Sequence, residues 1–121
     1  QALALCPPTA LADLGPMHNQ LGNLYQQVGQ IEPAREHYEK AAQLFEQTGN
    51  RYNAGRVRFN MAVMYLDAAG RESAPAGRRD LLARARAYAQ AALRDFQHYQ
   101  GRAAADEADA QRLLARIEGL L

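Results

Sequence analysis

Residues 18–25 of the chain read HNQLGNLY, and residues 58–65 read RFNMAVMY. In both stretches a large apolar residue precedes a small one, and a tyrosine stands three positions after the small residue. A glycine follows a few positions later, at Gly29 and at Gly70. Because a pattern that returns at a fixed offset indicates a repeated structural unit, the two stretches predict a repeat protein.

The segments that come next also resemble each other. Residues 34–42 read AREHYEKAA, and residues 84–92 read RARAYAQAA. After each comes an aromatic residue, Phe45 or Phe96, and then a glycine. The repeated unit is therefore a helix, a glycine turn, a second helix and a second glycine turn.

Apolar residues recur at steps of three and four along most of the chain, which is typical of helices with one buried face. No stretch shows the sustained alternation that indicates a strand. An all-α fold of about five helices is predicted, and the stripes lie in residues 14–28, 34–45, 54–65, 81–96 and 110–121.

Gly22 lies in the middle of a predicted helix, where glycine costs roughly 1 kcal/mol relative to alanine. A close approach of a neighbouring helix would explain this cost. Ala62 occupies the same position in the second repeat, and Tyr38 and Tyr88 are expected to fill the space beside the small residues. One hairpin alone leaves an apolar face bare, so the hairpins are expected to stack.

The composition limits the classes of function. The formal net charge of the 121 residues is +1, which argues against a nucleic-acid binder held by phosphate contacts. No apolar run approaches the roughly 20 residues of a membrane span. Residues 51–100 carry nine arginines against four acidic residues and could form a basic face. The alternative is a solvated helix surface with ion pairs four residues apart.

Cys6 is the only cysteine, so a disulfide framework is excluded and a reducing cytoplasm is the expected location. All but one of the basic residues are arginine and alanine is abundant, which suggests a bacterial protein. Gln1 in place of an initiator methionine indicates a fragment or a processed chain.

The repeated pattern resembles the tetratricopeptide repeat. The motif of that family runs aromatic, Leu-Gly-x-x-Tyr, Gly, and then Ala-x-x-x-Tyr/Phe-x-x-Ala. In this chain the matching residues are His18, Leu21, Gly22, Tyr25, Gly29, Ala34, Tyr38 and Ala41. The resemblance implies antiparallel helical hairpins stacked as a right-handed superhelix.

The chain departs from the family pattern at several positions. His18 and Arg58 stand where the first helix usually carries a tryptophan, and Arg84 stands at an alanine position. Gly22 and Ala62 are 40 residues apart, against about 34 in the standard repeat, so a variant with longer helices is expected.

Four segments are predicted from this alignment. Residues 1–8 are a remnant of a preceding helix and a linker, and residues 9–49 are the first hairpin. Residues 50–100 are the second hairpin, with an insertion between its helices near residues 71–79 that would form a loop. Residues 101–121 are a C-terminal capping helix. Two alternatives are open for the inserted loop: it takes part in recognition, or it is an insertion without a functional role.

In the resembled family the first helix of each hairpin lines a concave groove, and the resemblance implies that a partner binds there. Amide and guanidinium groups suit an extended peptide, because they bond to backbone carbonyls and carboxylates. For Phe59 and Val63, burial between flanking helices is the alternative. The predicted groove residues are those opposite the packed stripes: Asn19, Asn23, Gln26, Arg56, Phe59, Asn60, Val63 and Arg112.

Some tetratricopeptide domains bind the C-terminal carboxylate of chaperone tails with a clamp of lysine, asparagine and arginine. By the resemblance, Asn23, Asn60 and Arg112 stand at clamp positions. Asn19 and Ala108 stand where the two clamp lysines are expected, which removes most of the charge attraction. The sequence therefore favours a different partner segment.

No combination of residues predicts catalysis. The three histidines lie on separate predicted helices without metal-ligand spacing, and Cys6 has no second cysteine nearby. No glycine-rich loop follows a strand. The acidic residues Asp106, Glu107 and Asp109 begin a helix, where negative charge favours the helix dipole. We therefore expect no enzyme activity, no cofactor and no metal.

The predicted function is a protein-interaction module that binds a peptide or a protein segment, as part of a larger bacterial signalling or regulatory protein. The alternative is self-association, because an array with uncapped ends could stack end to end and expose an apolar face. No nucleic-acid or membrane partner is expected.

Overall fold

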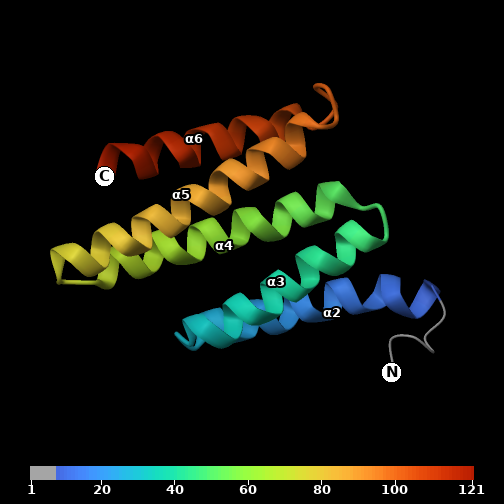
Figure 1. The fold of residues 1–121 in the computed structure, drawn as a ribbon, viewed down its shortest axis with the longest axis horizontal. Coiled ribbons are helices and arrows are strands. Elements are labelled where there is room, and N and C mark those ends of the chain that lie inside the picture. The colour runs from blue at the N-terminus through green and yellow to red at the C-terminus, as the bar shows by residue number, and fades with distance from the viewer. Residues whose placement is uncertain (1–7) are drawn as a thin grey trace. The chain divides into compact units, whose positions relative to one another are not determined.

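The computed structural model describes the backbone of residues 8–121 and the side chains from residue 14 onward. This part of the chain is all-α and contains no strand, as predicted. The helices are α2 (Pro8–Gln27), α3 (Ile31–Gln47), α4 (Arg51–Arg71), α5 (Pro75–Gln97) and α6 (Ala104–Leu120) (Figure 1). The helix remnant predicted in residues 1–8 lies outside the described residues, except for Pro8, where α2 begins.

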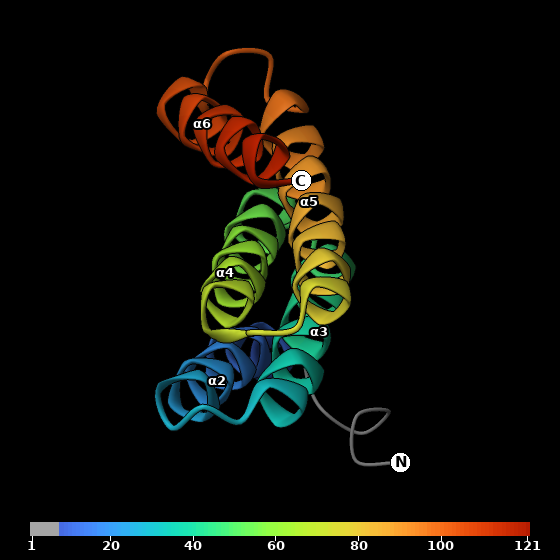
Figure 2. The same cartoon turned by 90° about the vertical axis from the view of Figure 1, so that its left-hand side faces the viewer.

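The chain divides into two compact units, Gln1–Val57 and Arg58–Leu121. In the first unit α2 and α3 lie antiparallel and side by side (Figure 2). In the second unit α5 packs against α6. Helix α4 contributes its first residues to one unit and the remainder to the other.

Glycines end both helices of the first hairpin, as the sequence predicts. Gly29 and Gly49 have φ of 80° and 77°, a region that glycine enters without a steric cost. After α2, the Gln30 N–H donates to the Tyr25 carbonyl at 2.9 Å. After α3, the Asn50 N–H donates to the Phe45 carbonyl at 2.7 Å. These bonds satisfy carbonyls that the helix ends would leave open.

The first hairpin is closed by aromatic rings of α3 packed on glycines of α2. A Cβ atom added at Gly22 would lie 2.6 Å from Cδ1 of Tyr38, and one added at Gly15 would lie 2.9 Å from Cε1 of Phe45. Tyr38 is fully buried and Phe45 is nearly so. The close helix approach predicted at Gly22 is therefore confirmed. Gly15, two turns earlier, serves Phe45 in the same way.

The expectation of a loop near residues 71–79 is wrong. Helix α4 continues to Arg71 and α5 begins at Pro75, so only Glu72–Ala74 separate them. Proline is well tolerated at the start of a helix, where its missing N–H has no intrahelical partner. The Glu72 carboxylate accepts the Ala74 N–H at 3.0 Å in this connection. Most of the extra residues therefore lengthen the two helices.

The second hairpin joins α4 to α5 through aromatic and charged contacts. The rings of Tyr65 and Tyr88 stack with centroids 5.7 Å apart, and the Arg84 guanidinium lies 5.9 Å from the Tyr65 centroid. Arg58 Nη1 donates to Asp95 Oδ2 at 2.7 Å. The buried side chains that α5 and α6 contribute include Leu82, Ala85, Ala89, Ala92, Phe96, Ala110 and Ile117.

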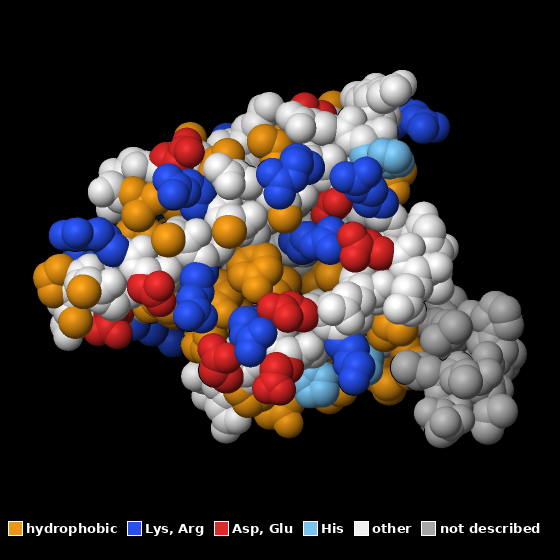
Figure 3. All heavy atoms as spheres, in the orientation of Figure 1, with side chains coloured by type: hydrophobic (Ala, Val, Ile, Leu, Met, Phe, Trp, Pro, Cys, Tyr) orange, Lys and Arg blue, Asp and Glu red, His pale blue; other side chains and the backbone are white. Residues whose placement is uncertain are grey.

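Charged side chains of both signs lie intermixed on the face shown in Figure 3. Arginines of the basic middle stretch pair with acids four residues away, as in Arg71–Asp67 at 3.7 Å and Arg84–Asp80 at 3.4 Å. These pairs agree with the solvated-surface alternative stated above. Among the described helices, none has the length and apolar character to cross a membrane.

Candidate functional site

Two predicted groove residues of α2 meet the buried tyrosine of α3. The Tyr38 hydroxyl donates to Gln26 Oε1 at 2.6 Å and also bonds with the Asn23 side chain. Burial raises the pKa of Tyr38 to about 12, so the phenol stays protonated at neutral pH. Because a phenol carries one proton, we expect one of the two amides to turn its NH₂ toward the phenol oxygen. Asn23 and Gln26 therefore have a structural role in closing the first hairpin.

Asn19 lies one turn before Asn23 on α2 and is half-buried. Its Oδ1 atom is buried and accepts no hydrogen bond from the described residues. An unsatisfied buried acceptor costs free energy, and its burial closes this atom to a donor from a bound partner.

Three aromatic rings of α2 and α3 residues form a stack in the same hairpin as Asn19, Asn23 and Gln26. His18 stacks on His37 with centroids 5.3 Å apart, and His37 stacks on Tyr25 with centroids 5.4 Å apart. The two Nδ1 atoms lie 3.0 Å apart, so one ring donates to the other. Burial lowers the pKa of His18, and the nearby His37 and Lys40 lower it further. His18, predicted as a packing residue, thus packs on a second histidine.

The predicted groove residues of α4 recur on one side of that helix. Arg56, Asn60 and Val63 follow at steps of four and three, so they share a face. Arg56 is exposed, Asn60 is half-buried, and Val63 is 36% exposed. The neighbouring Phe59 is half-buried, which lies between an open groove position and full burial between flanking helices. We call Arg56, Asn60 and Val63 the α4 stripe.

Arg112, the last predicted groove residue, is exposed on α6 and pairs with Asp109 one turn earlier. This pair lies within one helix and on its surface, where such pairs contribute little. The structure therefore places Arg112 within reach of solvent, with part of its charge already compensated.

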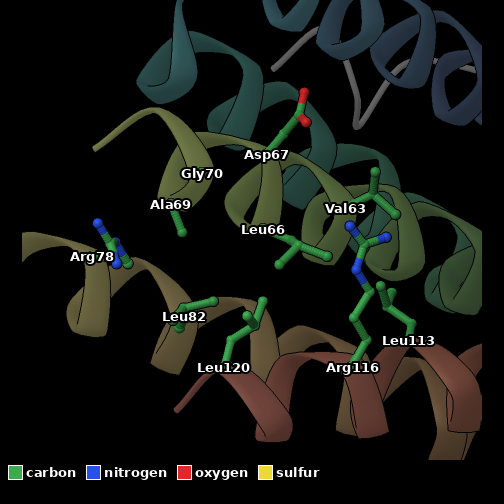
Figure 4. A pocket seen from close by; sticks show the side chains of 10 residues that line it. All are labelled: Val63, Leu66, Asp67, Ala69, Gly70, Arg78, Leu82, Leu113, Arg116 and Leu120. Atoms are coloured by element: carbon green, nitrogen blue, oxygen red, sulfur yellow. The ribbon is translucent and has the colours of Figure 1, made fainter. Parts of the chain in front are cut away.

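The second unit contains a half-open cavity of about 550 Å³ between α4, α5 and α6 (Figure 4). Its apolar lining comes mainly from leucines, and charged side chains stand around it. Val63 of the α4 stripe reaches this cavity, so the stripe and the cavity are continuous. The lining residues are Val63, Leu66, Asp67, Ala69, Gly70, Arg78, Leu82, Leu113, Arg116 and Leu120.

Val63 belongs to the predicted groove residues, whereas none of the cavity leucines was predicted from the sequence as part of a site. Leu82 and Leu113 lie within predicted apolar stripes and Leu66 directly follows one, and nothing in their spacing distinguishes a cavity wall from a core. Whether these leucines line a cavity or fill a core depends only on how the three helices are rotated relative to one another. A pocket with an apolar lining and a few polar groups is the usual form of a ligand site.

A buried ion pair was also missed. Asp95 is only 3% exposed, and its carboxylate bonds to Arg58 of α4. Arg58 stands at the usual tryptophan position and Asp95 lies 37 residues further on, so their spacing gave no signal. No group of three or more metal-ligating side chains occurs among the residues that the structure describes.

A family model described as tetratricopeptide repeat matches residues 13–74, about half of the chain. The chain therefore belongs to the tetratricopeptide repeat family, in agreement with the resemblance. This family generally mediates protein–protein interaction and is typically a non-catalytic scaffold. No curated protein and no solved structure matched the chain in the comparisons.

Proposed function

We propose that this chain is an interaction module that binds a segment of a partner protein through the predicted groove residues, above all through the α4 stripe. The observation that carries this proposal is the stripe itself. Arg56, Asn60 and Val63 combine a guanidinium, an amide and an apolar side chain on one accessible face of a helix. Such a combination can bond to a backbone, pair with a carboxylate and bury an apolar side chain.

Existing hydrogen bonds limit the part of the α2 residues in this proposal. The carboxamides of Asn23 and Gln26 are already engaged with Tyr38, so they would bind a partner mainly through their remaining polar atoms. The Oδ1 atom of Asn19 is buried, so it is not open to a partner. The α4 stripe is therefore the better target for a test.

The test compares two double variants of the same chemistry. Arg56→Ala with Asn60→Ala removes a guanidinium and an amide four residues apart on α4. Arg86→Ala with Gln90→Ala removes the same two groups at the same spacing on α5. Affinity capture from the native host, quantified by mass spectrometry, is expected to lose its specific partners only with the α4 variant. Equal retention by both variants would show that the stripe is not the binding face.

Self-association remains the alternative function, and sedimentation over a concentration series tests it. A strictly monomeric chain rules self-association out. If the chain forms a dimer and the Arg56 and Asn60 variant abolishes it, the partner of the stripe is a second copy of the chain. The wider proposal includes a cytoplasmic location and a larger bacterial signalling or regulatory protein, which the lone Cys6 and the arginine-rich composition support.

A further inference from the structure

The cavity of the second unit has a leucine centre and cationic ends. Leu66, Leu82 and Leu120 point toward one another from α4, α5 and α6 (Figure 4). Leu82 is almost fully buried, whereas Leu120 is 57% exposed. In the same view Arg78 stands at one end of these leucines and Arg116 at the other. The cavity volume of about 550 Å³ is within the usual range of ligand sites and exceeds one side chain.

The charge around the cavity is uneven. Asp67 also borders it, but its carboxylate pairs with Arg71 on the same helix at 3.7 Å. The Glu72 carboxylate, near Arg78, accepts the Ala74 N–H at the start of α5. Arg78 Nε donates to a backbone carbonyl, that of Glu72, at 3.4 Å. The two exposed guanidiniums therefore give the cavity rim a positive potential that favours anionic groups.

We propose that this cavity binds an amphipathic segment of the partner, with aliphatic or aromatic side chains on the leucines and carboxylates on Arg78 and Arg116. This inference rests on the proposed function, because it names the chemistry of the segment that the module binds. Burial of apolar side chains would supply most of the affinity. The two arginines would select acidic over basic segments, since complementary charge chiefly sets specificity.

A second copy of the chain fits this description poorly. Its acidic helices are α3 and α6, each with four carboxylates and two basic side chains. Leu113 and Leu120 of α6 already line the cavity itself. The apolar residues of α3, however, are buried in its own hairpin, including Tyr38, Leu44 and Phe45. The α3 helix of such a copy would offer carboxylates while these large apolar side chains stay buried. A partner segment with both features on accessible faces is the better match.

The test uses three short amphipathic peptides with the same leucine face and with glutamate, glutamine or lysine on the other face. Binding to the whole chain is measured by calorimetry, and methyl NMR reports on Leu66, Leu82 and Leu120. The glutamate peptide is expected to bind at least about tenfold more tightly than the lysine peptide. The glutamate peptide gains two exposed ion pairs with Arg78 and Arg116, whereas the lysine peptide is repelled by both arginines. Added salt is expected to reduce this difference.

A charge reversal locates the effect. Arg78→Glu with Arg116→Glu is expected to invert the preference between the acidic and the basic peptide. The matched control is Arg79→Glu with Arg86→Glu, which changes the net charge equally at exposed arginines outside the cavity lining. This control is expected to retain the preference for the acidic peptide. Circular dichroism checks that both variants are folded. The salt series on the unchanged chain is an independent measure of the electrostatic preference for the acidic peptide.

The inference would be overturned by equal binding of all three peptides, by a preference that survives the reversal at Arg78 and Arg116, or by no change at the cavity leucines. Leucine signals that change with protein concentration instead of peptide would also overturn it, in favour of a second copy. Partner loss by the Arg56 and Asn60 variant is measured separately. The two proposals can therefore fail separately. Loss of partners with the Arg56 and Asn60 variant supports the proposed function even if the cavity binds no acidic peptide. Binding of acidic peptides at the cavity supports this inference even if that variant keeps its partners.

Discussion

The two hairpins follow one repeat pattern but are closed by different chemistry. In the first hairpin, Gly15 and Gly22 of α2 receive the rings of Phe45 and Tyr38. In the second hairpin, Ala62 replaces the motif glycine, and the residue seven positions after the motif tyrosine is Asp95 instead of an aromatic. The first hairpin therefore depends on shape, and the second depends in part on a buried charge pair. Both solutions keep the same order of helices and turns.

The largest expected effect is on the second hairpin. Asp95→Ala removes the buried carboxylate that bonds to Arg58 at 2.7 Å. Breaking a buried pair by removing one partner is strongly destabilising, so we expect a loss of about 3 kcal/mol in the free energy of unfolding, measured by urea denaturation. The amides of α5 are expected to exchange faster than those of α2 and α3.

Asp80→Ala is the matched control for this variant. Asp80 lies on the same helix and pairs with Arg84 at 3.4 Å, but both side chains are about half exposed or more. Exposed pairs contribute roughly 0 to 1 kcal/mol, so the control should change stability little. Equal effects of the two variants would mean that the burial of Asp95 does not matter.

The second prediction concerns the shape-dependent contact of the first hairpin. Gly22→Ala would place a methyl group 2.6 Å from the buried Tyr38 ring, so the helices must separate or the ring must move. Overpacking of this kind typically costs about 1 to 3 kcal/mol, partly offset by the better helix propensity of alanine. Thermal unfolding followed by circular dichroism measures the change.

Gly70→Ala serves as the comparison in the other unit. No atom lies within 4 Å of a Cβ added at Gly70 on α4. The same substitution is therefore expected to leave stability unchanged or to raise it by up to about 1 kcal/mol. Stabilisation by both variants would disprove a tight contact at Gly22.

The smallest effect is a pH dependence that only the first hairpin should show. Burial, His37 and Lys40 lower the pKa of His18. The unfolded chain takes up a proton at the ordinary histidine pKa of about 6.5, before folded His18 does, so stability is highest above that pH and falls as the pH drops below it. Arg58 occupies the same repeat position in the second hairpin and does not titrate in this range.

Hydrogen exchange at about pH 7.5 and about pH 5.5, corrected for intrinsic rates, measures this difference. Amides of α2 and α3 are expected to lose protection on acidification, and His18→Gln should reduce the loss. Equal changes in α5 and α6 would contradict a specific role of His18. This result would not affect the predictions at Asp95 and Gly22.

Most of the fold was predictable from local pattern. Periodic apolar residues indicated five helices, and Gly29 and Gly49 end helices because only glycine enters positive φ without strain. The length of the loop near residues 71–79 was the error, because Pro75, Ala76 and Gly77 were interpreted as part of it although Pro75 begins a helix. Of the predicted groove residues, Arg56 and Arg112 are exposed, whereas Asn23 and Gln26 face the buried Tyr38. The binding role of the set remains a prediction.

The sequence by itself determined the repeat, the helix ends at Gly29 and Gly49 and the close packing at Gly22, since these depend on residues near one another or at a fixed offset. Only the tertiary structure decided that Asn23 and Gln26 meet the Tyr38 hydroxyl, that Arg58 meets Asp95, and that Val63 opens into a leucine-lined cavity. Such contacts depend on how helices distant in sequence are rotated against each other. Many residues share the same periodicity, and packing alone selects which of them touch.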